Sequence, residues 1–441
     1  MLKNRLWLIV ALLVILALVI AACGGGQPET EAPVVTEAPT TEELPYKGHT
    51  LTVWIGGHAV EQEPIWKWIE EGFEAQSGAQ VDLTLIGFDV YYTKLASAFE
   101  AGSPPDVAHA DLGGWVPAFA AKDYIIPLED QLATWEGTDQ IWPNLWITVS
   151  YDGKRWGVPW DTDNRFLIYN KQMFKDAGLD PEKPPTTWEE LVEYAQKLNQ
   201  PDKGIYGYGV SGVMNELATL GYMMFLGGNG GHILNEGWTG AGFNTPEGIE
   251  ALKMYTDLYT KYKVSPPGTP AEGEDEYRTA MAQGKVAMAV GGEWSWPLLY
   301  AANPATKGNI GTSIHPYNTT PFSVNGGWGS VIAKASKEQE LAWKFIEYYT
   351  SYDVWMYWMD HSDGPLPTRM DVTKDHPAFK SPLWQTALET YPKAEARPPI
   401  PEWPEISHEI QVMVQDVLTG KATPEEAVAK AAANVDALLQ K

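Results

Sequence analysis

The stretch that decides the fold runs from TLTVWIG (residues 50–56) through VDLTL (residues 81–85) to DVAHA (residues 106–110). Between these β-rich runs, over residues 64–78 and 91–102, apolar side chains recur every four positions, as on one face of a helix. Strands and helices that alternate in this order predict crossover connections and a mostly parallel sheet.

Polar and aromatic residues follow the ends of several predicted strands. His58 and Asp111 lie just past two such ends, where sheets of this kind bind small ligands. Three other segments set a tryptophan beside a glycine, a proline or a carboxylate: PWDTD (159–163), GEWSW (292–296) and NGGWG (325–329). An indole covers the apolar face of a sugar ring, and a carboxylate accepts hydrogen bonds from its hydroxyls. The pattern therefore favours a neutral polyol as ligand.

Further helix and strand signals extend over the rest of the chain. TWEE (187–190) and TPEE (423–426) have the spacing of capping boxes and predict helices that begin there. Residues 285–290 are strand-like, and the two glycines that follow allow a sharp turn that leaves Glu293 and Trp294 facing outward.

The N-terminal end has the features of an exported, lipid-anchored protein. A short basic start and an unbroken apolar run predict a secretory signal peptide over residues 1–22. The run ends in IAAC (20–23), which resembles the bacterial lipobox and predicts lipidation of Cys23, the only cysteine of the chain. Two acyl chains on this residue would give a lasting membrane attachment.

Residues 23–47 are rich in Pro, Glu, Thr and Gly and have almost no hydrophobic periodicity. Such a segment cannot bury enough apolar area to fold, so it predicts a flexible, lipid-anchored tether. The folded part is then expected on the outer face of the cytoplasmic membrane, in an extracellular or periplasmic location.

The charge balance narrows the classes of partner. The formal net charge of −26 would repel nucleic acids and anionic substrates, whereas neutral or cationic ligands remain compatible with it. The eight histidines are scattered without the spacing of metal ligands, and no glycine-rich phosphate loop is present in the sequence. We therefore expect neither a metal nor a cofactor.

Four segments resemble family 1 extracellular solute-binding proteins, the sugar-binding lipoprotein receptors of ABC importers that are related to maltose-binding protein. In chain order they are GKRWGVPWDTDNRFLIYNKQMFKDAGLDPEKPPTTWEEL (153–191), AMAQGKVAMAVGGEWSW (280–296), NGGWGSVIAKASKEQELAWKFIEYYTS (325–351) and GKATPEEAVAKAAANVDALL (420–439). The resemblance covers the chain from about residue 50.

The resemblance implies an α/β fold of the periplasmic-binding-protein type (type II). Each lobe of this two-lobed clamp is a mixed, mostly parallel sheet flanked by helices, and the ligand cleft lies between the lobes. The implied N-terminal lobe comprises residues 48–160 and 313–337, and the C-terminal lobe comprises residues 161–312 and 338–441. The chain would cross between the lobes near residues 158–165, 311–316 and 335–340.

The resemblance also implies a function. Such a receptor captures a mono- or oligosaccharide in the cleft, closes around it and delivers it to the transmembrane subunits of an ABC permease. It is expected to be a monomer and not an enzyme, with no nucleic acid among its partners and with the membrane reached through the lipid anchor.

Nine ligand-binding candidates follow from the strand ends and from the resemblance. Trp294 matches the stacking tryptophan of the family, and Asp163 matches the cleft carboxylate that follows the first crossing. The full set is His58, Asp111, Trp160, Asp161, Asp163, Glu293, Trp294, Trp328 and Arg369. The maltose-binding relative has an acidic residue where this chain has His58, so specificity for maltodextrins does not follow.

Three alternatives use similar residues. A receptor for a cationic molecule such as a polyamine would also use carboxylates and aromatic faces. An exported glycoside hydrolase would need two carboxyl groups roughly 5–9 Å apart, which Asp161, Asp163 and Glu293 could supply. A surface lectin would use the same side chains without the interlobe crossings.

Overall fold

Three larger sheets and a two-stranded ribbon organise the computed structural model, which describes residues 44–57, 62–362 and 364–440. The chain divides into units 1–43 and 44–441, and the description below concerns the second unit. The predicted signal peptide, Cys23, most of the predicted tether and His58 lie outside the described residues.

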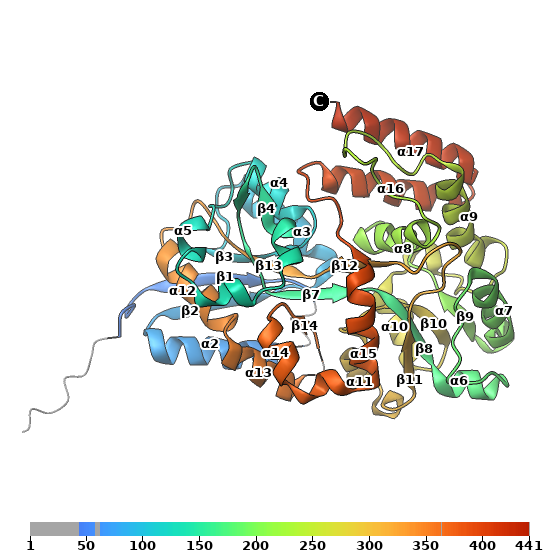
Figure 1. Cartoon of the computed structure of the whole chain (residues 1–441), viewed down its shortest axis with the longest axis horizontal. Helices are drawn as coiled ribbons and strands as arrows, with labels where there is room; N and C mark the ends of the chain where they lie inside the picture. The colour runs from blue at the N-terminus through green and yellow to red at the C-terminus, as the bar shows by residue number, and fades with distance from the viewer. Residues whose placement is uncertain (1–43, 58–61, 363, 441) are drawn as a thin grey trace, which may run out of the picture. The chain divides into compact units, whose positions relative to one another are not determined.

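The first sheet contains the three strands predicted at the start of the folded part. Its order is β2-β1-β3-β13-β6 (Figure 1). The strands are β1 (Thr50–Ile55), β2 (Gln80–Leu85), β3 (Val107–Asp111), β13 (Trp328–Ile332) and β6 (Val158–Pro159). β1 pairs in parallel with both β2 and β3, whereas β13 runs antiparallel to β3 and to β6. The predicted crossover order is therefore confirmed.

The first crossover helix shows why the sequence folds this way. Helix α2 (Glu63–Ser77) buries Ile65, Ile69 and Phe73, which share one face because they are spaced by four residues. Gly78 ends the helix in a left-handed conformation at φ +77°, and its N–H donates to the carbonyl of Glu74. The second crossover is α3 (Phe88–Glu100).

The second sheet has the order β11-β8-β10-β9. Its strands are β11 (Ile310–Ser313), β8 (Phe166–Asn170), β10 (Val286–Gly291) and β9 (Tyr206–Gly209). β10 is parallel to β9, and β8 runs antiparallel to both β10 and β11. All five residues of β8 are buried, as expected for a central strand covered by helices on both faces. We refer to the parts built on the first and second sheets as the first and second lobes.

A third sheet connects the two lobes, and its order is β14-β7-β12-β15. It contains β14 (Leu366–Pro367), β7 (Asp161–Asn164), β12 (Ser323–Gly326) and β15 (Ala394–Glu395). In the chain, β7 joins β6 of the first sheet to β8 of the second, and β12 leads directly into β13 of the first. Figure 1 shows β7 and β12 between the two lobes. We call this the connecting sheet.

The strands can be compared in position with the predicted crossings. The crossing near residues 158–165 coincides with β7. The crossing near 311–316 is displaced, because residues 310–313 form β11 and pair with β8 inside the second sheet. The return passage is instead β12 at residues 323–326. An edge strand and a linking strand have similar composition, so the sequence did not separate them.

Two helices depart from the predicted lobe boundary at residue 338. Helix α12 (Gln339–Tyr349) contacts β13 and α2, and α13 (Tyr352–His361) also contacts α2, so both pack against the first lobe. The cause is the apolar face of α12, where Phe345 packs edge-to-face against Phe73 of α2. The chain returns to the second lobe later, with α15 (Pro382–Thr390), which contacts β11.

The second lobe is completed by a group of packed helices. α16 (Trp403–Leu418) packs against α17 (Pro424–Leu439). α16 also contacts α8 (Glu216–Gly228) and α9 (Pro246–Thr260), and α17 contacts α9.

The remaining α-helices of the described residues are α4 (Trp115–Ala121), α5 (Glu129–Leu132), α6 (Lys171–Asp176), α7 (Trp188–Leu198), α10 (Glu274–Ala282), α11 (Ser295–Ala302) and α14 (Met370–Asp375). The ribbon consists of β4 (Ser150–Tyr151) and β5 (Lys154–Arg155). Both predicted capping boxes are present, at the starts of α7 and α17.

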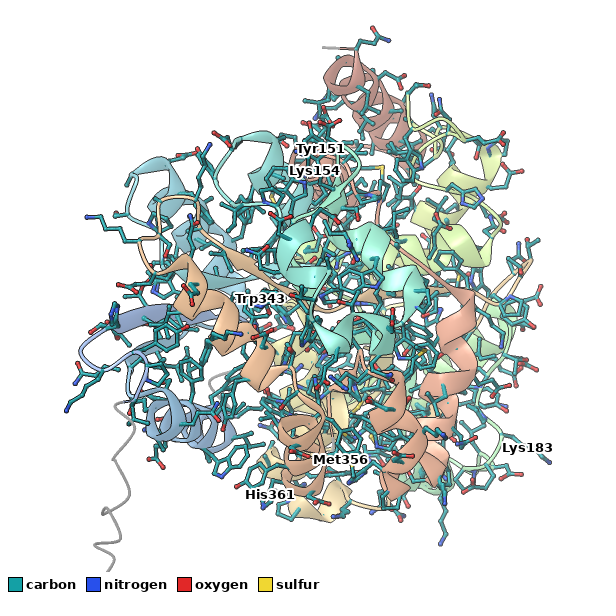
Figure 2. All side chains as sticks on the ribbon, turned by 60° about the vertical axis from the view of Figure 1, so that its left-hand side comes forward. Tyr151, Lys154, Lys183, Trp343, Met356 and His361 are labelled. Atoms are coloured by element: carbon teal, nitrogen blue, oxygen red, sulfur yellow. The ribbon has the colours of Figure 1, made fainter. Side chains whose placement is uncertain are left out.

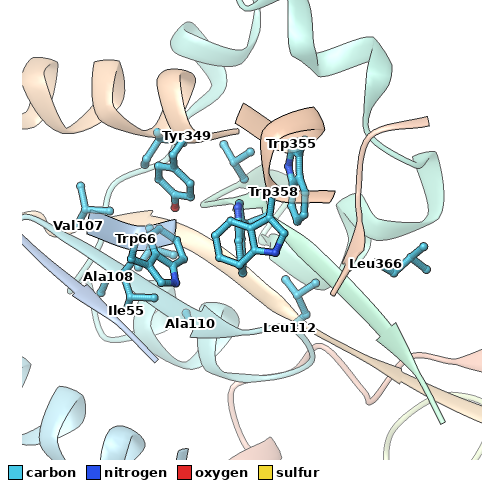
Figure 3. Close-up of a cluster of buried hydrophobic side chains, with 14 of the residues drawn as sticks. Ile55, Trp66, Val107, Ala108, Ala110, Leu112, Tyr349, Trp355, Trp358 and Leu366 are labelled. Atoms are coloured by element: carbon cyan, nitrogen blue, oxygen red, sulfur yellow. The ribbon is translucent and has the colours of Figure 1, made fainter. Parts of the chain in front are cut away.

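An aromatic core fills the first lobe above its sheet. Figure 3 shows Trp66 beside Trp358, with Tyr349 above them and the strand residues Ala108 and Ala110 below. Trp66 has no exposed surface, and its ring centroid lies 5.3 Å from that of Trp358 and 5.7 Å from that of Tyr349. Edge-to-face contacts of this kind add to the hydrophobic gain of burial.

The outer surface carries charged side chains that extend into solvent, such as Lys183 in Figure 2. Within the described ranges, the structure contains no helix that is both long and apolar enough to span a membrane.

Candidate ligand-binding site

A cavity lies where the two lobes and the connecting sheet meet. Its walls come from β1 and α2 of the first lobe, from β7 and the β12–β13 turn, and from α8 and α10 of the second lobe. The space open to the centre of a water molecule is about 70 Å³. Five aromatic side chains line it: Trp66, Phe88, Trp160, Trp294 and Trp328.

The structure brings six of the nine predicted site residues to this cavity. They are Asp111, Trp160, Asp161, Asp163, Trp294 and Trp328. His58 is outside the described residues, although Gly57 and Gln62 on either side of that gap both line the cavity. The first lobe, the second lobe and the connecting sheet each contribute to the six, so their convergence depends on the tertiary fold.

Arg369 does not line the cavity, contrary to the prediction. Its guanidinium makes two hydrogen bonds to Asp371, from Nε at 3.0 Å and from Nη2 at 2.7 Å. A third hydrogen bond runs from Nη1 to the carbonyl of Thr350. A carboxylate two residues along the chain therefore holds this arginine in its own loop.

Glu293 also lies outside the cavity, because its side chain is fully buried behind β7. One carboxyl oxygen accepts a hydrogen bond from the backbone N–H of Asn164 at 3.3 Å, and Oε1 has no partner within the described residues. Burial, together with the nearby Asp163, raises the pKa of Glu293 well above its usual value. The group is therefore a buried acid that holds its proton to unusually high pH.

This buried acid gives a pH-dependent stability with a defined sign. Because the folded-state pKa of Glu293 is raised, the folded protein binds more protons than the unfolded chain above about pH 4.5. Its free energy of unfolding should fall as pH rises from there, by at most about 1.4 kcal/mol per pH unit for one group. Glu293→Gln keeps an acceptor for Asn164 without the titration, so we expect the variant to be the more stable protein at pH 8.

Urea unfolding of both proteins at pH 5 and pH 8 measures this difference. The variant should show a shallower pH dependence. The remaining slope reflects the other buried groups, which include Asp111, Asp161 and Glu274, whose pKa values burial raises, and His109 and His315, whose pKa values burial lowers. A variant less stable than the natural protein at pH 8 contradicts the assignment.

Trp294 is fixed at both its edge and one of its faces. The indole Nε1 donates a hydrogen bond to Glu274, which is buried at the start of α10. The guanidinium of Arg165 lies over the indole ring, 5.0 Å from its centroid, in a cation–π contact. Arg165 is held in turn by Asp163, whose Oδ1 lies 2.8 Å from Nη1. These contacts orient the ring while it remains part of the cavity wall.

Trp328 is positioned by the connecting sheet and by a glycine. Its backbone N–H donates to Asp161 Oδ1 at 2.5 Å, and its ring packs edge-to-face on Phe88 and Trp115. Gly57 has φ +81°, and a Cβ atom at this position would lie 2.8 Å from the indole nitrogen. Glycine is therefore required for the first strand end to approach this tryptophan.

Trp160 continues the aromatic wall into the core of the first lobe. It lies 5.1 Å from Trp66 and 5.0 Å from His109, between ring centroids. His109 is fully buried, and burial lowers its pKa to about 3, so the imidazole is neutral at physiological pH. The wall is therefore apolar and uncharged on this side.

Each carboxylate of the cavity has a partner within the protein. Asp163 pairs with Arg165, and Glu274 and Asp275 both pair with Arg278. Asp161 accepts the N–H of Trp328 noted above. Asp111 forms an ion pair with Arg397, whose Nη2 lies 2.6 Å from Oδ1 of Asp111. The hydrogen bond of this Nη2 is donated to the carbonyl of Leu112. Burial raises the pKa of Asp111 to about 7, and Arg397 opposes this increase.

The consequence is a cavity rich in hydrogen-bonding atoms whose carboxyl groups already have partners within the protein. Arginine–carboxylate pairs keep their remaining lone pairs and N–H groups available to a polar ligand. No group of three or more His, Cys, Asp or Glu side chains that could hold a metal ion occurs in the part of the chain that the structure describes.

Several lining residues were not selected from the sequence, and four of them make the contacts described above or belong to the aromatic wall. These four are Trp66, Arg165, Glu274 and Arg397. Trp66 lies within a helical pattern that is typical of a helix packed on a hydrophobic core, so nothing marks it as a site residue. Arg165 lies two residues after Asp163, with which it forms an ion pair, so its position in the sequence favours a local pairing. Nothing local to the sequence marks Glu274 or Arg397, because their partners are distant along the chain.

A two-lobed α/β protein with an aromatic and polar cavity between its lobes is a small-molecule receptor by its architecture. Residues 58–354 match the family of bacterial extracellular solute-binding proteins, and the chain belongs to this family. The predicted fold and family are thereby confirmed, and the chain is a non-enzymatic solute receptor of ABC transport.

Solved structures of relatives agree with this assignment. A solute-binding protein of an ABC transporter from Thermotoga lettingae TMO, bound with α-D-tagatose, is 52% identical, with a TM-score of 0.87 over 89% of this chain and 100% of that chain. MalE3 of T. maritima, solved with maltose, is 28% identical, with a TM-score of 0.78 over 88% and 99%. A solute-binding protein of Agrobacterium radiobacter K84, in complex with ribitol, is 27% identical, with a TM-score of 0.76 over 89% and 100%.

Proposed function

We propose that this receptor binds a neutral monosaccharide or sugar alcohol in the interlobe cavity and delivers it to the transmembrane subunits of an ABC permease. The observation that carries the proposal is the internal pairing of the cavity carboxylates beside several indole faces. Such a site offers stacking surfaces and hydrogen-bond acceptors, and its carboxyl groups are already engaged within the protein.

The size of the cavity supports a ligand of one sugar unit. The 70 Å³ available to the centre of a water molecule corresponds to a ligand space on the order of 250 Å³ once the water radius is added. This is just below the roughly 300–1,000 Å³ typical of sites for drug-sized ligands. The relatives solved with tagatose and with ribitol each bind a ligand of a single sugar or sugar-alcohol unit.

The charge pairing argues against the polyamine alternative. A polyamine needs carboxylates that are free to pair with its ammonium groups. Here Asp163, Glu274 and Asp275 are already paired with arginines, and Arg165 and Arg397 add positive charge to the lining. A cation would have to displace these guanidinium groups from largely buried contacts, which is costly.

The proposed mechanism is closure around the sugar. The ligand stacks on indoles of one lobe, and the approach of the other lobe completes its hydrogen bonds. Only a ligand that binds the closed form more tightly can shift the equilibrium toward it. The proposed contacts are Asp111, Trp160, Asp161, Asp163, Trp294 and Trp328, with His58 as a further candidate.

A titration series tests the proposed ligand class. Intrinsic tryptophan fluorescence and calorimetry would be followed on the purified protein with D-tagatose, other hexoses, ribitol, maltose and spermidine. We expect saturable binding of at least one single-unit sugar or sugar alcohol and no binding of spermidine. Saturable spermidine binding without any sugar response would favour the cationic alternative.

For the location, we propose a monomeric receptor tethered by residues 23–47 to a diacylglyceryl group on Cys23, outside the cytoplasmic membrane. The support is the lipobox-like IAAC (20–23) after an apolar run. Mass spectrometry of the mature chain should show cleavage before Cys23 and the mass of a lipid on its thiol. A mature chain without this modification would contradict the anchor.

A further inference from the structure

A buried arginine bridges the two lobes at one end of the cavity. Arg397 follows β15 of the connecting sheet, and 1% of its side chain is exposed. Its Nη2 lies 2.6 Å from Asp111 Oδ1 and donates to the carbonyl of Leu112, both at the end of β3 in the first lobe. Its Nη1 donates at 3.0 Å to Glu216 Oε1, at the start of α8 in the second lobe.

The bridge is held from several sides. Glu216 also accepts hydrogen bonds from Trp403 Nε1 at 3.0 Å and from the hydroxyl of Ser407, both on α16. Gly113 has φ +114°, and a Cβ there would lie 2.9 Å from the Cβ of Arg397. The first lobe can therefore approach the arginine closely only through a residue without a side chain.

A larger groove lies on the other side of this bridge. It has a volume of about 550 Å³, compared with about 70 Å³ for the cavity. Glu216 lines the groove, Asp111 and Arg397 line the cavity, and Phe88 lines both spaces. The ion-pair bridge thus stands between two adjoining spaces.

The groove has the same chemical character as the cavity. The first lobe contributes the rings of Phe88, Tyr92 and Trp115, and the facing α16 contributes polar side chains that include Glu405 and Gln411. Aromatic faces opposite hydrogen-bond acceptors suit another sugar ring. The space beyond the bridge could therefore hold a second unit if the bridge were absent.

We propose that the Asp111–Arg397–Glu216 bridge is the wall that limits the ligand to one sugar unit, an inference that rests on the proposed function. The bridge closes the cavity before the groove begins, and a longer ligand would have to displace the Arg397 guanidinium. Displacement would leave Asp111 and Glu216 without their cation in a buried place, which strongly disfavours the longer ligand.

The test compares one-unit and two-unit ligands on the natural protein and on variants with the wall removed. The main variant is Arg397→Ala combined with Glu216→Gln, which removes the guanidinium without leaving that glutamate as an unpaired charge. Arg397→Gln with Glu216→Gln is a milder second variant that shortens the side chain and keeps polar groups. Circular dichroism and thermal melting establish that each variant is folded.

Two comparison variants accompany these proteins. Glu216→Gln alone reports the effect of the lost charge. Arg155→Ala removes an arginine of similar pairing far from the cavity, whose Nη2 lies 2.7 Å from Glu129, and it should keep the ligand preference of the natural protein.

Affinities for a hexose panel and for a panel of disaccharides are measured by calorimetry. We expect the natural protein to bind hexoses at least 100-fold more tightly than disaccharides. In the main variant this ratio of affinities should fall at least tenfold, because the affinity for disaccharides increases. The milder variant should change in the same direction. The proposed role of the bridge is wrong if folded variants bind a hexose but keep the affinity ratio of the natural protein. It is also wrong if the natural protein binds hexoses and disaccharides with equal affinity. If the natural protein binds no sugar in either panel, the proposed function itself is wrong, and so is the proposed role of the bridge that depends on it.

Discussion

Replacing Trp66 with alanine should lower the free energy of unfolding by about 3–5 kcal/mol, the range for truncating a buried aromatic side chain. Trp66 has no exposed surface and packs against Trp160, His109, Tyr349 and Trp358, with ring centroids 5.1–5.7 Å apart. The side chains around Trp66 are held in place by α2, α13 and the first sheet. They cannot move fully into the space of the missing indole, so a cavity would remain.

The measurement is guanidinium unfolding of both proteins without ligand, because Trp66 also lines the cavity and bound sugar would add its own stabilisation. Trp238→Ala is the matched control, since 42% of Trp238 is exposed in the second lobe. The control should remain within about 0.5 kcal/mol of the natural protein. A loss below about 1 kcal/mol for Trp66→Ala would show that the core repacks around the site.

Trp294→Ala should weaken sugar binding by about 1–3 kcal/mol, the scale of burying one large apolar side chain. This corresponds to a loss of roughly 5- to 150-fold in affinity. The expected loss has two sources. The ligand loses an indole face, and Arg165 loses the ring that its guanidinium covers at 5.0 Å.

Trp294→Phe separates the loss of the aromatic ring from the loss of the indole N–H. Phenylalanine keeps an aromatic face but cannot donate the hydrogen bond to Glu274, so we expect an affinity between those of the natural protein and Trp294→Ala. Calorimetry with the tightest ligand of the panel provides the comparison, and Trp238→Ala again serves as control. Unchanged affinity in Trp294→Ala would remove this residue from the binding site.

Local patterns in the sequence predicted local structure well. The period-four pattern at residues 64–78 gave α2 with its glycine stop, and the capping boxes gave the starts of α7 and α17. These features depend on neighbours within a few residues, where spacing alone determines which atoms can meet.

The candidate site was predictable where residues follow strand ends or resemble known positions. Six of nine candidates line one cavity. Arg369 was misplaced because a carboxylate two residues away competes for its guanidinium, and sequence alone does not rank a local pair against a cavity. Glu293 follows the predicted turn, but its side chain points into the interior rather than into the cavity.

What the sequence could not supply is long-range pairing. Arg397 meets Leu112 across 285 residues and Glu216 across 181, and no periodicity or motif connects such positions. The displaced crossing at β12 has a similar origin, since β11 becomes an edge strand only through its partner β8. Packing of α12 onto α2 likewise depends on which lobe presents a complementary face.

The internal pairing of the cavity carboxylates has a consequence outside the cell, where salinity varies widely. Screening shortens the reach of charge from about 10 Å at 0.1 M salt to about 3 Å at 1 M, and receptors that attract charged nutrients lose affinity accordingly. An uncharged guest held by a lining whose carboxylates are satisfied by neighbouring guanidinium groups and a backbone N–H experiences no such loss. Binding of a neutral sugar by this receptor should then depend only weakly on the salt concentration.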